Sequence, residues 1–158
     1  MSIDGRELRN ALGRFATGVC LITLETSDGD ALALTANSFS SVSLDPPLVL
    51  WNLQNNSDVF EHYARGQYFA INILADNQQS LSDSYARKGE HNLHPDHFRR
   101  GVKGSPVING ALVSFECELE ATHEGGDHLI IVGRVLEMTE AAGGDPLLFF
   151  GGAYRALG

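Results

Sequence analysis

The segment TANSFSSVSLDPP, residues 35–47, joins the apolar run ALAL before it to the apolar run LVLWNL after it. It carries five hydroxyl side chains, one Asn and a Pro-Pro pair. Short apolar runs bounded by turn-forming residues are typical of β-strands. The segment is therefore predicted to be a polar junction between two strands. Its hydroxyls and backbone N–H groups are suited to binding a flat polar ligand.

Further strands and helices are predicted on both sides of this junction. Strands are expected at about residues 19–24, 31–36, 47–53, 68–74, 113–122, 128–138 and 147–150. Short helices are expected at about residues 4–17, 58–65 and 76–87. Asp4 with Glu7 resembles a capping box at the start of the first helix, and Ser57 and the pair Asp76–Gln79 are expected to cap the other two.

Three of these segments carry more specific expectations. PLVLWNL (residues 47–53) is apolar at nearly every position, which predicts a strand buried on both faces. Residues 113–122 alternate apolar and polar side chains, which predicts one dry and one wet face. Residues 88–110 are rich in Gly, Pro and His and are expected to form an irregular loop with a functional role or disorder.

Six or seven strands follow one another through tight turns, such as SDGD and EGGD, with only three short helices between them. This order favours a mainly β fold, an antiparallel β-barrel with α-helices packed on it, over a parallel α/β sheet. No internal repeat or linker divides the chain, so residues 1–158 are expected to form a single domain.

Composition excludes several classes of function. The net charge of −9 argues against nucleic-acid binding. No apolar run reaches the length of roughly 20 residues that a membrane helix needs, and MSIDGRELRN does not resemble a signal peptide. Cys20 and Cys117 lie in apolar runs without a CxxC spacing, so both are expected to be reduced core residues of a cytoplasmic protein.

The residues alone leave the functional motifs open. His128 follows the predicted EGGD turn, where it could contact a ligand or simply face solvent. HNLHPDH (residues 91–97) invites a metal interpretation, but no Cys or Glu set completes a site and no metal is predicted. Ser57, Arg87 and Lys88 could contact a phosphate. Equally, Ser57 could be an ordinary helix cap, since the neighbouring Asp58 would repel a phosphate. Arg87 and Lys88 could be solvated surface charges.

Five stretches resemble the flavin reductase family, the small partners of two-component flavin-dependent monooxygenases. They occur in family order over nearly the whole chain: GRFATGVCLIT (13–23), TANSFSSVSLDPPLVL (35–50), FAINIL (69–74), GSPVINGALVSFECELE (104–120), and GGDH followed by GRV (125–135). The resemblance implies an FMN-binding split β-barrel with a Greek-key antiparallel core. It also implies a homodimer that reduces FMN or FAD with NADH or NADPH and passes reduced flavin by diffusion to a separate oxygenase.

The resemblance also implies roles for individual residues. His128 matches a histidine on the nicotinamide side, which makes it the catalytic candidate. Segment 35–38 would line the isoalloxazine ring, Ser40 and Ser41 the ribityl chain and phosphate, and residues 55–57 a second wall. The full cofactor-binding set is Thr35, Ala36, Asn37, Ser38, Ser40, Ser41, Asn55, Asn56, Ser57, Arg87, Lys88, Gly89 and Tyr154. Where the family often has Ser-x-Thr, this chain has Asn55-Asn56-Ser57-Asp58, which weakens the phosphate assignment there.

Three alternatives remain at this point. A non-catalytic flavin-binding or redox-sensing module would use the same fold without oxidising NAD(P)H. A pyridoxamine-phosphate-oxidase-like enzyme would need more basic residues than this acidic chain carries. A purely structural dimer would leave the hydroxyl-rich junction unexplained. The sequence does not choose between FMN and FAD, between NADH and NADPH, or between flavin as prosthetic group and flavin as substrate.

Overall fold

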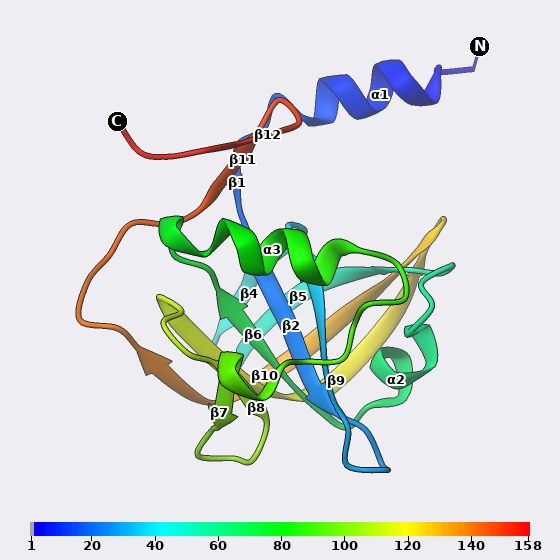
Figure 1. The fold of residues 1–158 in the computed structure, drawn as a ribbon. Coiled ribbons are helices and arrows are strands. Elements are labelled where there is room, and N and C mark those ends of the chain that lie inside the picture. The colour runs from blue at the N-terminus through cyan, green and yellow to red at the C-terminus, as the bar shows by residue number, and fades with distance from the viewer. Residues whose placement is uncertain (1) are drawn as a thin grey trace.

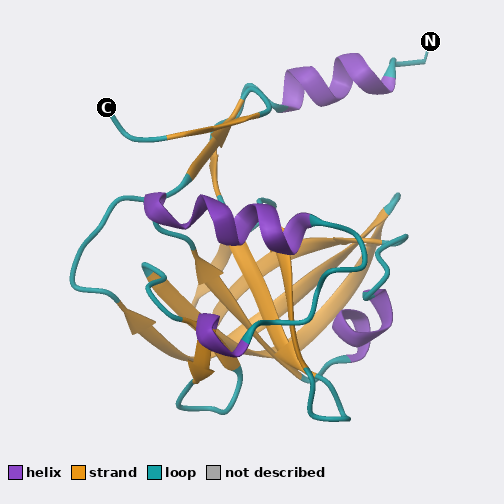
Figure 2. Cartoon of the chain, in the orientation of Figure 1, coloured by secondary structure: helices purple, strands orange, loops and turns teal. Residues whose placement is uncertain are grey.

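Strands outnumber helices in the computed structural model, which describes residues 2–158 (Figures 1 and 2). The helices are α1 (Gly5–Leu12), α2 (Phe60–Arg65) and α3 (Gln79–Ala86), with two short 3₁₀ turns, η1 (Asp76–Gln78) and η2 (Pro95–His97). The strands are β1 (Thr17–Gly18), β2 (Cys20–Glu25), β3 (Ala31–Ala36), β4 (Ser40–Leu44), β5 (Pro47–Gln54), β6 (Tyr68–Ile73), β7 (Phe98–Arg100), β8 (Pro106–Ile108), β9 (Val113–Gly125), β10 (His128–Glu140), β11 (Leu148–Phe150) and β12 (Ala153–Arg155). The prediction of a mainly β chain is confirmed.

Seven strands form the main sheet in the order β3-β2-β6-β9-β10-β5-β4. All of its neighbouring strands pair antiparallel, and the hairpin of β9 and β10 is the longest pairing. Within residues 2–158, β3 and β4 are the two edges and do not pair with each other, so the strand pairings close no ring. The antiparallel part of the fold prediction is confirmed, while the closed barrel is not seen.

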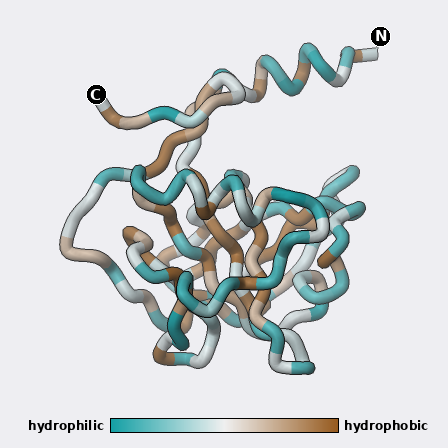
Figure 3. Tube along the Cα trace, viewed as in Figure 1, coloured by the Kyte–Doolittle hydropathy of each residue, from teal (hydrophilic) through white to brown (hydrophobic). Residues whose placement is uncertain are grey.

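The core lies between the inner faces of these strands. Trp51, Phe69 and Ile131 are almost fully buried there, and Tyr63 of α2 packs edge-on against Trp51. Each large apolar side chain buried in this way contributes about 1.5–3 kcal/mol of transfer free energy. Figure 3 shows the most hydrophobic segments concentrated in the central strands. No helix among the described residues is long and apolar enough to cross a membrane.

The prediction that β5 is buried on both faces is wrong for the single chain. Val49, Trp51 and Leu53 are buried, whereas the alternating Leu48 and Leu50 keep part of their surface exposed. Alternating burial is normal for a strand whose second face is not covered by another layer of the protein. The outer face of β5 therefore presents apolar side chains.

The first helix is shorter than predicted and does not pack on the sheet. Asp4 caps it by accepting a hydrogen bond from the Arg6 amide, but α1 ends at Leu12 instead of Thr17. Thr17 instead pairs with Phe149 in the small sheet β1-β11-β12. Figure 1 shows α1 standing away from the main sheet, and none of its residues is buried.

The other two helix starts also differ from the sequence prediction. α2 begins at Phe60, after a turn in which the Ser57 hydroxyl accepts a hydrogen bond from the Val59 amide at 3.3 Å. Before α3, the side chain of Gln78, not Gln79, closes the turn by accepting from the Ala75 amide at 2.9 Å. Local side-chain bonds of this kind compete with helical pairing and shift the boundary by a residue or two.

The predicted wet face of β9 is wrong at its start. Ser114 and Glu116 are only 3% and 1% exposed. Ser114 donates a hydrogen bond to Asn72 Oδ1, and Glu116 Oε1 accepts one from the Lys103 amide at 2.9 Å. The loop between β7 and β8 covers this part of the strand, which an alternating pattern alone does not reveal.

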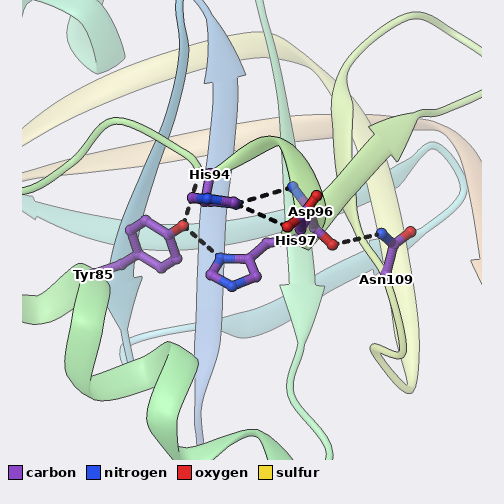
Figure 4. A network of polar contacts seen from close by, with 5 residues as sticks. All are labelled: Tyr85, His94, Asp96, His97 and Asn109. Atoms are coloured by element: carbon purple, nitrogen blue, oxygen red, sulfur yellow. Dashed lines mark hydrogen bonds and ion pairs between the residues drawn. The ribbon is translucent and has the colours of Figure 1, made fainter.

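Residues 88–110 are more ordered than the predicted irregular loop, since they contain η2 and the hairpin of β7 and β8. Figure 4 shows how the segment is fastened to α3 through the hydroxyl of Tyr85, which accepts from the His94 amide at 2.9 Å and contacts His97 Nδ1 at 2.8 Å. Asn109 Nδ2 donates to the Asp96 carbonyl across the same segment. The histidines therefore fix the backbone, and within residues 2–158 no group of three metal-ligating side chains comes together.

Candidate functional site

A cavity of about 360 Å³ opens where β3 ends. Five consecutive residues, 34–38, form one side of it, and Asn52 and Gln54 of β5 form its floor. The turn at residues 56–58, the end of α3 with the segment after it, and His128 complete the lining. The volume lies in the usual range for small-molecule sites. The junction that the sequence singled out therefore does border a pocket.

Two side-chain hydrogen bonds hold residues 35–38 in place. Thr35 Oγ1 donates to the Ser82 carbonyl of α3 at 2.7 Å. Ser38 Oγ accepts from the Asn52 amide of β5 at 2.9 Å. Because this segment is tied on both sides, its backbone groups are fixed before any ligand arrives, which is the condition for electrostatic preorganisation.

Of the second wall, Asn56 and Ser57 line the pocket but Asn55 does not. Asn55 is instead bonded to the β9–β10 turn, where its amide donates to the Asp127 carbonyl at 3.0 Å and its side chain to the Gly126 carbonyl at 3.2 Å. Its role is to hold that turn, and with it His128, beside residues 56–58.

The two basic residues after α3, Arg87 and Lys88, do not lie in the same place. Lys88 lines the pocket, whereas Arg87 points elsewhere, to Glu90 at 3.6 Å, with 65% of its side chain exposed. Gly89 does not line the pocket; its amide donates to Asp58 Oδ2 at 2.6 Å. Among the described lining residues, Lys88 is the one lysine or arginine. A ligand's negative end is therefore expected near Lys88.

His128 lies at the start of β10, where it is directly opposite Gln54 of β5. Its Nδ1 is 2.7 Å from Asp127 Oδ1. The hydrogen bond and the charge of His128 hold the pKa of the Asp127 carboxyl below its ordinary value. The contact leaves Nε2 of His128 as the ring nitrogen available to a bound molecule.

Tyr154 borders a second, smaller cavity of about 210 Å³, which shares Thr35, Ala36 and Asn37 with the first. Its hydroxyl is 2.5 Å from Ser82 Oγ, and its ring packs edge-on against Phe149. Burial raises the pKa of Tyr154, so the phenol keeps its proton. Tyr154 and Lys88 thus line two different cavities that share residues 35–37.

Ser40 and Ser41 lie on β4, where they pair with Leu50 and Val49 and are exposed. They do not line the 360 Å³ pocket. Their contact with a cofactor stays a prediction, as do the roles of the other residues assigned from the resemblance.

Asn52, Gln54, Asp58 and His91 line the pocket without having been predicted. The alternation of β5 could have identified the first two, since polar side chains recur at every second position toward its end. Asn52 Oδ1 is buried and has no hydrogen-bond partner among the described residues. A buried acceptor without a partner is costly. The hydroxyls and Lys88 of the pocket lining fit a polar ligand with an anionic end.

The comparisons with known proteins agree on one family. A family model described as "Flavin reductase like domain" matches residues 12–158. The chain is 44% identical over 151 residues to an FMN reductase (NADH) from Agrobacterium fabrum, covering 96% of this chain and 85% of that protein. It is 35% identical over 156 residues to the reductase subunit of a flavin-dependent monooxygenase from Rhodococcus jostii, covering 99% of this chain and 80% of that protein.

A solved structure shares the fold closely. The NADH:FAD oxidoreductase of Streptomyces globisporus, solved with NAD and FAD fragments, superposes with a TM-score of 0.91 at 31% identity. The match covers all of this chain and 97% of that one. Two other curated relatives are longer, and the chain spans 42% and 48% of their length.

Proposed function

Because this chain belongs to the flavin reductase-like family, we propose that it is an NAD(P)H-dependent flavin reductase. It transfers hydride from the nicotinamide to FMN or FAD and supplies reduced flavin to a separate monooxygenase component. One relative is named as an FMN reductase that uses NADH, and one solved structure is named as an NADH:FAD oxidoreductase. The proposal therefore includes both flavins and favours NADH as the hydride donor.

The observation that carries this proposal is the pocket at residues 35–38, whose wall is fixed by two hydrogen bonds and whose lining includes one lysine, Lys88. Lys88 suits the phosphate, and His128 suits the nicotinamide.

When bound, the nicotinamide and the flavin supply the hydride donor and acceptor, so the chain itself contributes orientation, exclusion of water and electrostatic stabilisation. Backbone N–H groups of residues 35–38 are held in place by Thr35 and Ser38. They are positioned to stabilise negative charge on the pyrimidine side of the ring. No acid or base is required for this step, and His128 acts by orienting the nicotinamide.

A homodimer is part of the proposal, and exposed apolar surface supports it. On α1, Leu8 and Leu12 are 46% and 65% exposed, and Phe15 just after it is 79% exposed. An isolated helix of eight residues is only marginally stable in water, so the apolar face of α1 is expected to pack against another surface. We propose that a second copy of this chain supplies that surface. The outer face of β5, with Leu48 and Leu50, offers a further apolar surface for that contact.

The remaining parts of the proposal concern fold and location. β3 runs into β4 through residues 37–39, and Ser38 bonds back to β5. This curvature of the sheet supports a split-barrel, Greek-key description of one domain over residues 1–158. Cys20 and Cys117 are free and buried, which supports a reducing cytoplasmic location.

Steady-state NAD(P)H oxidation, measured with FMN or FAD in all four combinations, tests this function. A saturable dependence of the rate on both substrates is expected for at least one pair, with NADH preferred. A rate no higher than the protein-free rate in every combination would leave a non-catalytic flavin-binding module as the better account.

A further inference from the structure

Asp58 is an acidic residue in the wall of the pocket, which Lys88 also lines. An uncompensated carboxylate there would repel a phosphate. Both of its oxygens are engaged: Oδ2 accepts from the Gly89 amide at 2.6 Å, and Oδ1 is 2.9 Å from His91 Nε2. Partial burial acts to raise the pKa of Asp58, but these partners outweigh it and hold the pKa below its ordinary value. Asp58 is therefore ionised.

His91 faces acceptors on both ring nitrogens. Its side chain is only 5% exposed, and Nδ1 lies 3.0 Å from the Ala33 carbonyl oxygen. A carbonyl oxygen and an ionised carboxylate can only accept, so this arrangement is satisfied when both nitrogens carry a proton.

The pair also connects three segments of the pocket. The backbone carbonyl of His91 accepts from the Ala33 amide at 2.8 Å, and Leu93 N donates to Ala31 O at 2.9 Å, so residues 91–93 run along β3. Asp58 belongs to the turn before α2, and Gly89 follows Lys88 directly. Asp58 and His91 thereby fix the loop that carries Lys88 against the turn at residues 56–58.

Other charged groups lie on the far side of the pair. A cavity of about 260 Å³ there is lined by Asp28, Asp30 and His62, together with Asp58 and His91. Two further acidic residues on that side make the compensation by His91 more important, because they add to the negative field behind the phosphate end.

We propose that Asp58 and His91 are positioning residues that select phosphorylated flavins over riboflavin. His91 cancels the charge of Asp58, and the pair holds Lys88 where the flavin phosphate binds. The inference rests on the proposed reductase function. A purely structural role for the same pair would affect phosphorylated and unphosphorylated flavins equally.

The test is the ratio of the KM for FMN to the KM for riboflavin, with NADH saturating, in three variants. His91→Gln leaves Asp58 uncompensated, and its ratio is expected to rise about tenfold with little change in kcat. His91→Lys keeps a positive charge, and the double variant Asp58→Asn/His91→Gln removes both charges. Both are expected to keep the ratio within about twofold of the wild type.

His62→Gln is the matched control, since His62 lies on the far side of the pair and outside the flavin pocket. It should leave both KM values unchanged. Should His91→Gln fail to fold, the neutral double variant retains the test, because it contains no uncompensated buried charge; a ratio more than about twofold above that of the wild type in this variant would then overturn the inference.

Two results would overturn the inference: an equal rise of both KM values in His91→Gln, or a double variant whose ratio is as high as that of His91→Gln. A wild-type protein that oxidises NADH with neither FMN nor riboflavin would instead refute the proposed function itself.

Discussion

Thr35 and Ser82 are joined by a 2.7 Å hydrogen bond from the Thr35 hydroxyl to the Ser82 carbonyl. The hydroxyl of Ser82 in turn lies 2.5 Å from that of Tyr154. These contacts tie the end of β3 to α3 and to the C-terminal hairpin of β11 and β12. One residue of the hydroxyl-rich junction thus braces the wall that two cavities share.

Thr35→Val should therefore weaken both stability and flavin binding. The valine keeps the shape but leaves the Ser82 carbonyl without this donor, which costs about 1–2 kcal/mol. Urea unfolding measures the stability, and the KM for FMN measures the loss of a fixed wall. Thr139→Val on β10, where the side chain is exposed, is the control. Equal, small effects of both variants would show that the Thr35 bond does not brace the site.

His128→Ala is expected to raise the KM for NADH about tenfold, the effect of one lost hydrogen bond to a bound ligand. The KM for flavin should change less, because the contact proposed for His128 is with the nicotinamide. His123→Ala, on the exposed part of β9 and outside the pocket, serves as control. An unchanged KM and kcat for NADH in His128→Ala would remove the orienting role from this residue.

The strands β9 and β10 were predictable from sequence because apolar alternation and the EGGD turn between them are local signals. The burial of Ser114 and Glu116 was not predictable, since Ser114 bonds to Asn72 of β6 and Glu116 to the β7–β8 loop. In α1, the apolar spacing correctly predicted a helix. The expectation that the helices pack on the sheet is wrong for α1, because periodicity does not say whether the covering surface belongs to the same chain.

The candidate site was predictable only in part, because local patterns mark some of its residues and long-range contacts bring the others to it. Residues 35–38 stand out because hydroxyls and an Asn gather at one strand end. His91 and Asp58 meet across a sequence separation of more than thirty residues, and only the pairing of residues 91–93 with β3 brings them together. No local pattern could have shown that His91, the first histidine of HNLHPDH, pairs with Asp58 in the pocket wall.

The exposed face of α1 predicts a change of oligomeric state. Replacing Leu8 and Leu12 together with Glu places two charges on the apolar face, which a second copy of the chain could not bury without cost. Light scattering coupled to size exclusion should then show monomers where the wild type shows dimers. Asn10→Glu, an exposed position on the same helix, should leave the dimer intact. A wild type that is monomeric at every concentration tested would contradict the proposed dimer.

The two cysteines predict a loss of stability at high pH. Burial raises the pKa of the Cys20 and Cys117 thiols to about 12 from an ordinary value of 9.0, with Glu116 adding to the shift at Cys117. A folded-state pKa above the unfolded one favours the folded protein below pH 9.0. That contribution is lost as the pH rises from there toward 12, by about 1.4 kcal/mol per pH unit for each thiol.

Urea unfolding at a series of pH values from 8 to about 11 measures this dependence. At neutral pH the folded protein should react with a thiol reagent only through unfolding, since both thiols are buried and protonated. Rapid labelling of either cysteine in the folded protein would contradict the assignment.

The central claim is that the pocket at residues 35–38 serves hydride transfer from a nicotinamide to a flavin. Anaerobic mixing of the protein with NADH and FMN, followed at the nicotinamide and flavin absorbance bands together, tests it most directly. The account predicts that NADH and oxidised FMN are consumed in a one-to-one molar ratio, far faster than without protein, and that FMN in large molar excess over the protein is reduced completely when NADH is at least equimolar with FMN. Loss of neither absorbance above the protein-free rate, or loss of NADH without reduction of the flavin, would contradict it.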